Sequence, residues 1–538
     1  MMSGRGSDTR GIALTEAPAQ ARAETEYRYP TLPQRAVAQR AQTQPDEPAI
    51  ISEAGNRTWA ELEARTNQLI RAMRARGVET PQAIALVCSN RPEFAEVYLA
   101  AARNGLRLTT INWHLGAEEI AYIVNDCDAT ILVGDVRFAG TLVEAAKLTP
   151  NATTKLAVGG AIEGFEDYDA AVSAEPGDAV DNEGFGTTML YTSGTTGRPK
   201  GVYRRRAAPR RAQNEAVRIH EDGDLHLCTG PLYHAAPLAF SLGLPYLWGV
   251  GVVVMDGWDP ESTLRLIEEH KITHVHMVPI MFHRLLALPE EVRNRYDVSS
   301  LKRIGHGAAP CPVGVKKAMI EWVGPIIWEY YAATEGAGTS IESDEWLRKP
   351  GSVGKAEEGQ VEIRDDDGEP VARGEIGKIY LKAPEEPETR FEYYKDPDKT
   401  AGAYRDTHFT LGDMGYLDPD GYLFLTDRSA DLIISGAVNI YPAEVDAVML
   451  MHPAVADSCT VGVPNDEWGE SVQGVIQLKV GIEPTAALEQ ELIAFARERL
   501  AHFKCPKSIA FEEELPRLET GKLYRRLIRE KYREKAST

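Results

Sequence analysis

The most informative segment of the 538-residue chain is Tyr191-Thr192-Ser193-Gly194-Thr195-Thr196-Gly197-Arg198-Pro199-Lys200-Gly201. It continues an apolar run, 188–191, that predicts a strand. Glycines let a backbone approach an anion closely, hydroxyl and N–H groups donate hydrogen bonds to it, and Lys200 adds positive charge. The lysine comes three residues after Gly197, so the spacing differs from that of a Walker loop. The segment predicts a phosphate-binding loop, against the alternative of a surface turn rich in glycine and threonine.

The charge balance restricts the class of partner. The chain has 59 basic and 80 acidic residues, which gives a net charge of −21. Nucleic-acid-binding proteins gain affinity from cationic contacts with phosphates, so nucleic acid is not expected as a partner. A phosphorylated ligand remains compatible, because a local site can oppose the sign of the whole protein. The five arginines between Arg204 and Arg211 form such a local cluster, although a solvated loop is slightly favoured over a site for ATP, CoA phosphates or an anionic membrane surface.

Cysteine usage and hydropathy indicate the compartment. The six cysteines form no C-x-x-C pair, which disfavours a zinc ribbon or a redox dithiol and fits a reducing cytoplasm. The first 24 residues lack the apolar region of a secretory signal. The segment 228–255 carries no charged residue, but its three prolines disfavour a membrane-spanning helix and favour a buried core. We expect a cytoplasmic protein without a transmembrane segment, while peripheral membrane contact and a homodimer stay open.

Apolar runs alternate with helical patterns over most of the chain. The expected strands include 83–88, 130–133, 188–191, 251–255 and 273–278, and the expected helices between them include 92–103 and 136–148. This alternation predicts an α/β fold with substantial parallel sheet. Strand candidates at 432–435 and 472–480 and a helical pattern at 488–500 predict a separate α+β domain of about 110 residues at the C-terminus.

Six further motifs follow the loop. They are Pro231-Leu232-Tyr233-His234, Gly307-Ala308-Ala309-Pro310, Tyr331-Ala332-Ala333-Thr334-Glu335, Leu411-Gly412-Asp413-Met414-Gly415, Asp427-Arg428 and Pro516-Arg517-Leu518-Glu519-Thr520-Gly521-Lys522. Together with the loop, they resemble the signature of the adenylate-forming superfamily of acyl-CoA synthetases, luciferases and carrier-protein adenylation domains. The similarity extends from about Tyr29 to the C-terminus. It implies a flexible leader, 1–28, a large multi-layered N-terminal AMP-binding domain, 29–428, and a mobile C-terminal domain, 429–538.

The resemblance implies an ATP-dependent carboxylate–CoA ligase. A carboxylate attacks the α-phosphate of ATP, which gives an acyl-adenylate and pyrophosphate, and the thiol of CoA then displaces AMP. Because both reactants of the first step are anions, catalysis should consist of positioning and charge neutralisation. Four alternatives stay open: transfer to a carrier-protein thiol, another nucleophile or an unusual acid, a catalytically silent binding protein, and a luciferase-like oxygenase.

The resemblance also implies residue roles. Lys522, Thr334 and Glu335 would be catalytic: Lys522 would bridge the carboxylate and the α-phosphate, Thr334 would hydrogen-bond that phosphate, and Glu335 would hold Mg²⁺. The residues that would bind ATP or AMP are Thr192, Ser193, Gly194, Thr195, Thr196, Gly197, Lys200, Gly307, Ala308, Ala309, Tyr331, Ala332, Thr334, Asp413 and Arg428. Among them, Tyr331 would stack on adenine and Asp413 would accept the ribose hydroxyls.

The acid itself is less defined. By analogy with the family, Tyr233, His234, His306 and Gly336 would line its pocket, and the small residues at 336–338 would leave room for a bulky or elongated acyl group. Fatty, aryl and sterol side-chain acids all stay open.

Two positions depart from the family pattern. The hinge between the domains is expected at Ala430, where the family usually has Lys or Asp, and Ala332 replaces a glycine. Neither change removes a group that does chemistry, but Ala430 has no polar group that could stabilise either domain orientation.

Overall fold

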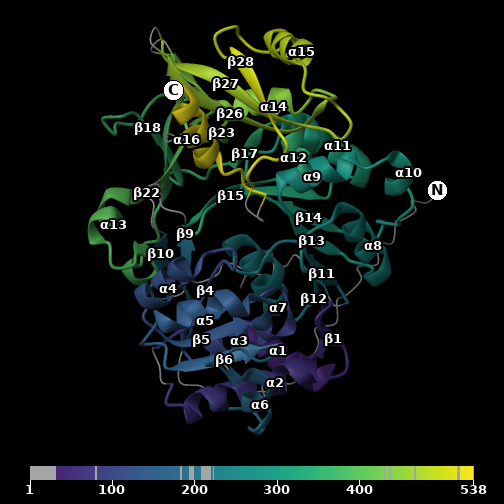
Figure 1. Cartoon of the computed structure of the whole chain (residues 1–538), viewed down its shortest axis with the longest axis vertical. Coiled ribbons are helices and arrows are strands. Elements are labelled where there is room, and N and C mark those ends of the chain that lie inside the picture. Colours follow the sequence, from purple (N-terminus) through teal and green to yellow (C-terminus); the bar gives the residue numbers. More distant parts are fainter. Residues whose placement is uncertain are drawn as a thin grey trace, which may run out of the picture.

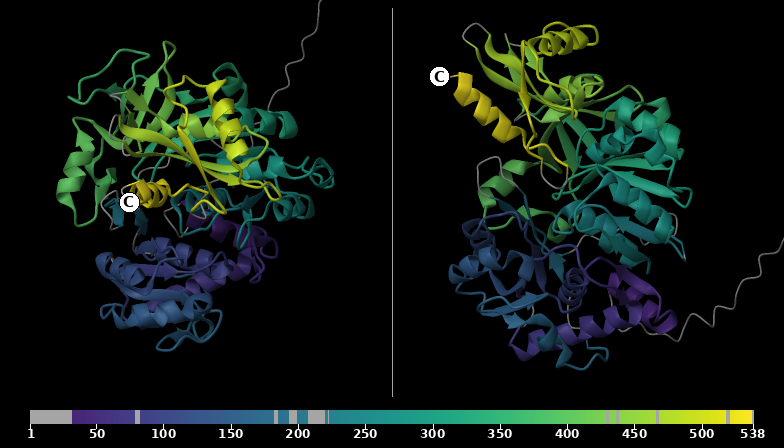
Figure 2. Two further views of the ribbon diagram at one scale, coloured as in Figure 1. Left: turned by 45° about the horizontal axis from the view of Figure 1, so that its top comes forward. Right: turned by 45° about the vertical axis from the view of Figure 1, so that its right-hand side comes forward.

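The computed structural model describes residues 32–78, 82–181, 185–192, 199–206, 220–221, 223–428, 431–435, 438–465, 468–517 and 521–536. In Figure 1, the N-terminal elements lie at the bottom, the middle of the chain lies above them, and the C-terminal elements lie at the top. Figure 2 shows the C-terminal part seated on the middle part, and its right-hand view shows it away from the first elements of the chain.

A six-stranded parallel sheet lies at the bottom of Figure 1, in the order β7-β6-β5-β3-β4-β8. Its strands are β3 (Ala83–Val87), β4 (Arg107–Thr110), β5 (Ala129–Asp135), β6 (Thr154–Val158), β7 (Glu166–Asp167) and β8 (Thr187–Thr188). The helices around it are α2 (Trp59–Ala75), α3 (Pro92–Arg103), α4 (Ala117–Asp126), the 3₁₀ turn η2 (Val136–Phe138), α5 (Ala139–Lys147) and α6 (Tyr168–Ser173).

Local sequence explains several of these elements. All five residues of β3 are buried, as expected of a central strand covered on both faces. Helix α3 begins with Pro92, whose fixed φ suits the first helical position. Helix α2 begins with a capping box, in which the Thr58 side chain accepts from the Glu61 amide and the Glu61 side chain accepts from the Thr58 amide.

A second, eight-stranded sheet has the order β16-β15-β14-β13-β11-β12-β1-β2 and is parallel except at its two edges. Its strands are β1 (Pro48–Ile51), β2 (Arg57–Thr58), β11 (Leu225–Cys228), β12 (Gly251–Val254), β13 (His274–Met277), β14 (Arg303–His306), β15 (Ile327–Ala332) and β16 (Ala337–Glu342). The associated helices are α1 (Leu32–Thr43), the π-helix η5 (Pro237–Gly243), α7 (Leu244–Leu247), α8 (Pro260–His270), α9 (Pro279–Ala287), α10 (Glu290–Arg293), α11 (Val313–Val323) and α12 (Ser343–Arg348). One core cluster includes residues of both sheets, among them Leu86 on β3 and Val252 on β12, so the two sheets share one lobe.

Two antiparallel sheets follow. The first is three-stranded, with β9 (Leu190–Thr192), β10 (Lys200–Tyr203) and β20 (Glu392–Tyr393). The second comprises β17 (Ser352–Lys355), β18 (Val361–Arg364), β19 (Gly377–Lys382), β21 (Tyr404–Arg405), β22 (His408–Leu417) and β23 (Tyr422–Arg428). Along the chain, η6 (Pro387–Thr389) comes directly before β20, and α13 (Pro397–Ala403) lies between β20 and β21.

The C-terminal part has its own sheet and core. Its strands are β24 (Ile433–Ser435), β25 (Val438–Ile440), β26 (Val455–Asn465), β27 (Gly469–Leu478) and β28 (Ser508–Glu512), and its helices are α14 (Pro442–Met449), α15 (Ala486–Arg497) and α16 (Arg525–Ala536). The prediction of a large α/β lobe with a smaller α+β part is therefore confirmed. The limits 1–28, 29–428 and 429–538 stay predictions, and both the leader, 1–28, and Ala430 lie outside the described residues.

The apolar run at 188–191, expected as one strand, is divided. Thr187 and Thr188 pair with β4 in the parallel sheet, whereas Leu190 to Thr192 pair with β10 in a different sheet. The chain changes sheets at Met189, which is fully buried. Elsewhere, none of the helices within the described ranges is both long and apolar enough to cross a bilayer.

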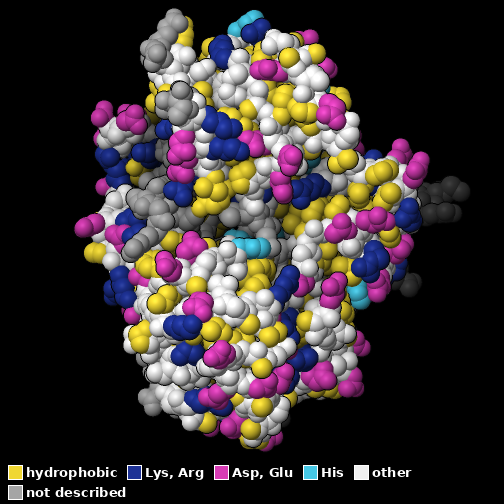
Figure 3. All heavy atoms as spheres, in the orientation of Figure 1, with side chains coloured by type: hydrophobic (Ala, Val, Ile, Leu, Met, Phe, Trp, Pro, Cys, Tyr) yellow, Lys and Arg dark blue, Asp and Glu magenta, His cyan; other side chains and the backbone are white. Residues whose placement is uncertain are grey.

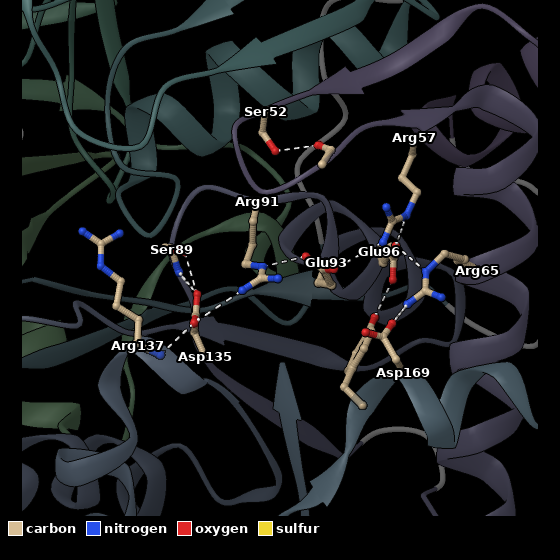
Figure 4. A network of polar contacts seen from close by, with 12 residues as sticks. Ser52, Arg57, Arg65, Ser89, Arg91, Glu93, Glu96, Asp135, Arg137 and Asp169 are labelled. Atoms are coloured by element: carbon tan, nitrogen blue, oxygen red, sulfur yellow. Dashed lines mark hydrogen bonds and ion pairs between the residues drawn. The ribbon is translucent and has the colours of Figure 1, made fainter. Parts of the chain in front are cut away.

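A buried ion network braces the first lobe (Figure 4). Glu96 on α3 is fully buried and accepts hydrogen bonds from Arg57 Nε at 2.9 Å, Arg65 Nε at 2.7 Å and the Tyr168 hydroxyl at 2.8 Å. These partners come from β2, α2 and α6. A single carboxylate thus connects four elements, and we expect its removal to deprive two largely buried arginines of one of their partners.

Candidate active site

The predicted phosphate loop joins two paired strands. Thr192 ends β9 and faces Lys200, the first residue of β10, across an antiparallel pair. The loop residues between them, Ser193, Gly194, Thr195, Thr196 and Gly197, lie outside the described residues. The Lys200 ammonium donates to Asp396 at 2.6 Å, and this bond raises the pKa of the lysine and lowers that of the carboxyl. Lys200 is therefore held, fully charged, at the base of the loop.

The segment that carries Thr334 and Glu335 lies beside this strand pair. Arg204, at the end of β10, donates from one nitrogen to the carbonyl oxygens of both residues. The Tyr393 hydroxyl donates to Glu335 Oε1 at 3.0 Å. A guanidinium and a phenol therefore fix the backbone and the carboxylate of the segment separately.

Cations outnumber carboxylates in this cluster. Lys399 lies 4.5 Å from the centre of the Tyr393 ring, and its pKa is lowered, first by burial and then by the positive charge of Lys200. Three cationic side chains (Lys200, Arg204 and Lys399) thus accompany two carboxylates (Glu335 and Asp396). A local excess of positive charge suits a polyphosphate, whatever the charge of the whole chain.

We expect Arg204→Ala to lower kcat/KM for adenylation by about 10- to 100-fold, because the segment carrying Thr334 and Glu335 loses its clamp and small misplacements are costly. The matched control is Arg205→Ala, since Arg205 is exposed and its ion pair with Glu392 is long, at 3.6 Å. Steady-state pyrophosphate-exchange kinetics measure both. Equal losses in the two variants would show that bulk charge matters and that the clamp does not.

Tyr331 and Asp413 meet on the other side of the segment. The Tyr331 hydroxyl donates to Asp413 Oδ2 at 2.7 Å, and both side chains are buried. Asp413 on β22 pairs through its backbone with Arg428 on β23, whose side chain is outside the described set. The phenol therefore orients a carboxylate that is expected to meet the ribose.

The 307–309 loop approaches the same region from β14. A Cβ on Gly307 would lie 2.6 Å from the Tyr330 ring, so only glycine allows this close approach. Ala308 has φ +66°, a left-handed conformation that costs a non-glycine residue about 1 kcal/mol. Backbone strain of this kind is common where a ligand is bound.

His234 lies on the acid side of the site. Its ring centre is 4.3 Å from that of Tyr233, which in turn packs 4.4 Å from Trp113. No hydrogen-bond partner for His234 Nε2 is found within the part of the chain that the structure describes. Desolvation and then the charge of Lys522 lower the pKa of His234 to about 3, so the ring is neutral at neutral pH.

We expect Lys522→Ala to raise the pKa of His234, because a nearby positive charge is removed from a group that becomes positive on protonation. The pKa should stay below the usual 6.5, since desolvation persists. Histidine ring chemical shifts followed by NMR over pH 3–8 report it, with Arg526→Ala as a control on the same terminal segment. An unchanged titration would separate Lys522 from the acid pocket.

The charge of Lys522 reaches His234 because the segment 517–522, called the lysine loop below, docks on the large lobe through Gly521. Gly521, with φ +72°, lies so close to the carboxyl end of β13 that a Cβ would be 2.4 Å from Ile280 and 2.7 Å from Val278. Arg517 Nη2 donates to Asp457 at 2.6 Å, and Arg517 also donates to the Gly521 carbonyl. Arg517 is thereby tied to the C-terminal sheet, and Gly521 lies directly against the large lobe.

Two predicted acid-lining residues lie elsewhere. His306 points to the opposite face of the eight-stranded sheet, where its ring packs 5.0 Å from that of Phe282. A Cβ on Gly336 would meet the Phe409 ring at 2.5 Å, so this glycine allows close packing and does not open space for an acyl group. The structure therefore places His306 away from His234, and it gives Gly336 a packing role beside Phe409.

The sequence motifs did not include the partners of the phosphate side. Tyr393, Asp396 and Lys399 follow Lys200 by about 190 residues, and the local signal at 396–397 is only the Asp-Pro pair that starts a helix. Arg204 was placed in a solvated cluster, because the carbonyl groups it binds lie 130 residues away. Such long-range partners leave no local pattern.

Comparisons with known proteins agree with this geometry. Residues 37–386 match the family model described as AMP-binding enzyme, and residues 444–522 match its C-terminal domain. The chain belongs to the AMP-binding enzyme family. It is 33% identical over 498 residues to 2-succinylbenzoate–CoA ligase of Geobacillus kaustophilus, a match that covers 91% of this chain and 96% of that protein.

Two further similar proteins show which substrates and which intermediate occur among these enzymes. A long-chain-fatty-acid–CoA ligase of Mycobacterium tuberculosis is 30% identical, over 88% of this chain and 93% of that protein. The structure of o-succinylbenzoate CoA synthetase from Bacillus subtilis with its acyl-adenylate has a TM-score of 0.74 and 27% identity, covering 92% and 97% of the two chains. This member of the family is accordingly an acid–thiol ligase that uses ATP and CoA and acts through an acyl-adenylate.

Proposed function

We propose that the ligase forms its acyl-adenylate at the junction of the phosphate cluster, the Tyr331–Asp413 pair and the Lys522 loop. The phosphate side would be bound by Thr192, Lys200 and the 193–197 loop, with Thr334 on the α-phosphate. Adenine and ribose would be bound by Gly307, Ala308, Ala309, Tyr331, Ala332, Asp413 and Arg428. His234 and Tyr233 would border the acid.

The docking of Gly521 on the large lobe, together with the effect of the Lys522 charge on His234, is the observation that carries this proposal. When a carboxylate oxygen attacks the α-phosphorus, the bond to pyrophosphate breaks and two anions share a small volume. An ammonium held between them stabilises the charge that develops there. Because His234 is neutral, it neither neutralises the acid nor competes with Lys522 for it.

Magnesium fits Glu335. Glu335 Oε1 accepts from Tyr393, and the same carboxylate has a second oxygen to offer. No group of three or more His, Cys, Asp or Glu side chains that could hold a metal occurs in the described ranges. That suits Mg²⁺, which commonly takes one or two carboxylates and completes its shell with substrate phosphates and water. When bound, it would neutralise phosphate charge.

A cavity of about 280 Å³ lies between the large lobe and the C-terminal part, beside the Gly521 contact, with residues of both parts in its lining. Its lining includes Gly230 and Pro231, next to the acid side, and Arg284, Arg517 and Gly521. We propose that the thiol of CoA attacks the acyl carbonyl after the lysine loop withdraws, which releases AMP. Ala430 would be the hinge of that movement.

The decisive experiment is ATP–pyrophosphate exchange over a panel of fatty, aryl and sterol side-chain acids, followed by thioester detection with and without CoA. Exchange together with a CoA thioester supports the proposal. Exchange without any CoA thioester would support the adenylation step but contradict CoA as the acceptor. A carrier-protein thiol or another nucleophile would then be the acceptor.

A further inference from the structure

The segment 229–234, which carries Tyr233 and His234, connects β11 to η5. Since β11 ends at Cys228 and η5 begins at Pro237, the segment lies outside the paired strands, and most of it is buried. Buried backbone N–H and C=O groups nevertheless need hydrogen-bond partners. Several of these partners are side chains that come from the end of the neighbouring six-stranded sheet.

Asn90 is the first such partner. It lies between β3 and α3 and is 3% exposed. Its Nδ2 donates to the carbonyl oxygens of Gly230 at 2.9 Å and Met255 at 2.8 Å. Its Oδ1 accepts from the Leu232 amide at 2.9 Å. Asparagine suits this place because a short side chain offers both donors and an acceptor, and its three hydrogen bonds join the six-stranded sheet to the chain that follows β11 and β12.

The residues on both sides of Asn90 are themselves held (Figure 4). The Ser89 hydroxyl donates to Asp135 Oδ2 at 2.6 Å, and Arg91 Nη1 lies 3.5 Å from Asp135 Oδ1. Asp135 is buried at the end of β5, which pairs with β3. The turn that carries Asn90 is therefore fixed to its own sheet.

Thr110 supplies a second attachment. It is the last residue of β4, which pairs with β3, and it is 4% exposed. Its Oγ1 donates to the Tyr233 carbonyl at 2.9 Å. Because Tyr233 directly precedes His234, this hydrogen bond fixes the backbone next to the histidine. Asn90 and Thr110 thus bind the segment at residues 230, 232 and 233.

We propose that Asn90 and Thr110 are positioning residues, which set the place of the His234 and Tyr233 side chains by binding the backbone of the segment. This inference rests on the proposed function, which places the acid beside those two side chains. Small misplacements near reacting groups are costly, and a shift of about 1 Å can lower a rate about 100-fold. The loss should appear in kcat/KM for the acid and spare the binding of ATP, whose proposed contacts lie on other strands.

The sharpest kinetic test compares Thr110→Val, which loses the hydroxyl, with Thr110→Ser, which keeps it. The probe is the acid that gives the fastest pyrophosphate exchange among the fatty, aryl and sterol side-chain acids. Thr110→Val should lower kcat/KM for this acid by about 10-fold, because a buried carbonyl loses its partner, and Thr110→Ser should stay within about threefold. The Kd of ATP from isothermal titration calorimetry should change by less than about twofold in both variants. Equal losses of ATP affinity and of kcat/KM would contradict a positioning role.

NMR of the histidine ring signals measures the position of His234 without any acid, and His234→Ala identifies its signal. The signal should move in Thr110→Val and in Asn90→Ala, and it should stay in place in Thr110→Ser. The matched control is Thr66→Val, in which another buried threonine, on α2, loses a hydroxyl that donates to the Leu62 carbonyl at 2.7 Å. It should leave both the signal and the kinetics unchanged. Circular dichroism shows whether Asn90→Ala folds, and the Thr110 pair decides alone if it does not.

The two readouts separate the failure of this inference from that of the proposed function. An unmoved His234 signal in Thr110→Val and in folded Asn90→Ala would overturn the positioning role, whichever acid is used. A moved signal with unchanged kcat/KM for the acid would show that the segment does not border the acid, which contradicts the proposed function. Exchange with none of the acids would also contradict the proposed function, and the His234 signal would still decide the positioning role.

Discussion

Lys522→Ala is expected to lower ATP–pyrophosphate exchange by about 10²–10³-fold, the loss typical when one preorganised donor to developing charge is removed. The reason is geometric: the lysine loop is docked on the large lobe through Gly521, and its charge is felt by His234. Thioester formation from preformed acyl-adenylate should be largely spared, because we propose that the loop has withdrawn before the thiol attacks. Single-turnover assays of the two half-reactions measure each loss.

Arg526→Ala is the matched control for Lys522→Ala. Arg526 is another cation of the terminal segment, half-exposed and paired with Glu530 at 3.5 Å on α16. It should change either half-reaction by less than about twofold, as exposed pairs contribute little. Near-normal exchange by Lys522→Ala, or an equal loss in both variants, would remove Lys522 from the catalytic role.

Glu96→Ala is expected to lower the free energy of unfolding by about 3 kcal/mol, the low end of the range for breaking a buried ion pair. Glu96 is fully buried between Arg57 and Arg65, and each arginine keeps a second carboxylate, Glu93 or Asp169. Those second partners limit the loss. Chemical denaturation followed by far-UV circular dichroism gives the change for the transition of the large lobe.

Glu269→Ala tests whether burial is the cause. Glu269 forms an i,i+4 pair with Arg265 on α8, and both side chains are about half exposed. Its removal should cost less than about 0.5 kcal/mol. Glu96→Gln, which keeps the volume and one acceptor, should fall between the two alanine variants. If Glu96→Ala is no more destabilising than Glu269→Ala, the network does not stabilise the lobe.

Features encoded by neighbouring residues could be predicted from the sequence. Helix α3 was expected at 92–103 and occupies those residues, because Pro92 marks its start and its apolar positions are local. The strand expected at 83–88 became β3 for the same reason. The motif order also identified the family before any geometry was known.

Features that depend on the face of a strand or on distant partners could not be predicted. His306 directly precedes the motif Gly307-Ala308-Ala309-Pro310, yet its position in β14 turns it toward Phe282, on the opposite face of the sheet. Gly336 was interpreted as room for substrate, but the ring of Phe409, more than 70 residues later, occupies that room. Trp328 belongs to none of the sequence motifs, and the register of β14 and β15 shows that it lies beside Gly305.

Net charge also predicted little about the local chemistry, because charged side chains that are distant in the sequence come together only in the fold. In Figure 3, acidic and basic side chains are interspersed over the face shown. Lys200, Arg204 and Lys399, which form the local excess of positive charge, come together through β10 and α13. The value of −21 therefore describes the surface as a whole and not the site.

Under the domain movement that we propose, the close approach of Gly521 favours a fully docked arrangement over a partly docked one. Van der Waals contacts such as those with Val278 and Ile280 weaken within an ångström, so a partly docked lobe would gain almost nothing from them. The enzyme would then alternate between two populations, one that can adenylate and one that can admit a thiol. Any stabilisation of the first population is taken from the second, and the fastest overall turnover requires that neither dominate. The absence of a side chain at Gly521 would thereby influence the ratio of the two populations.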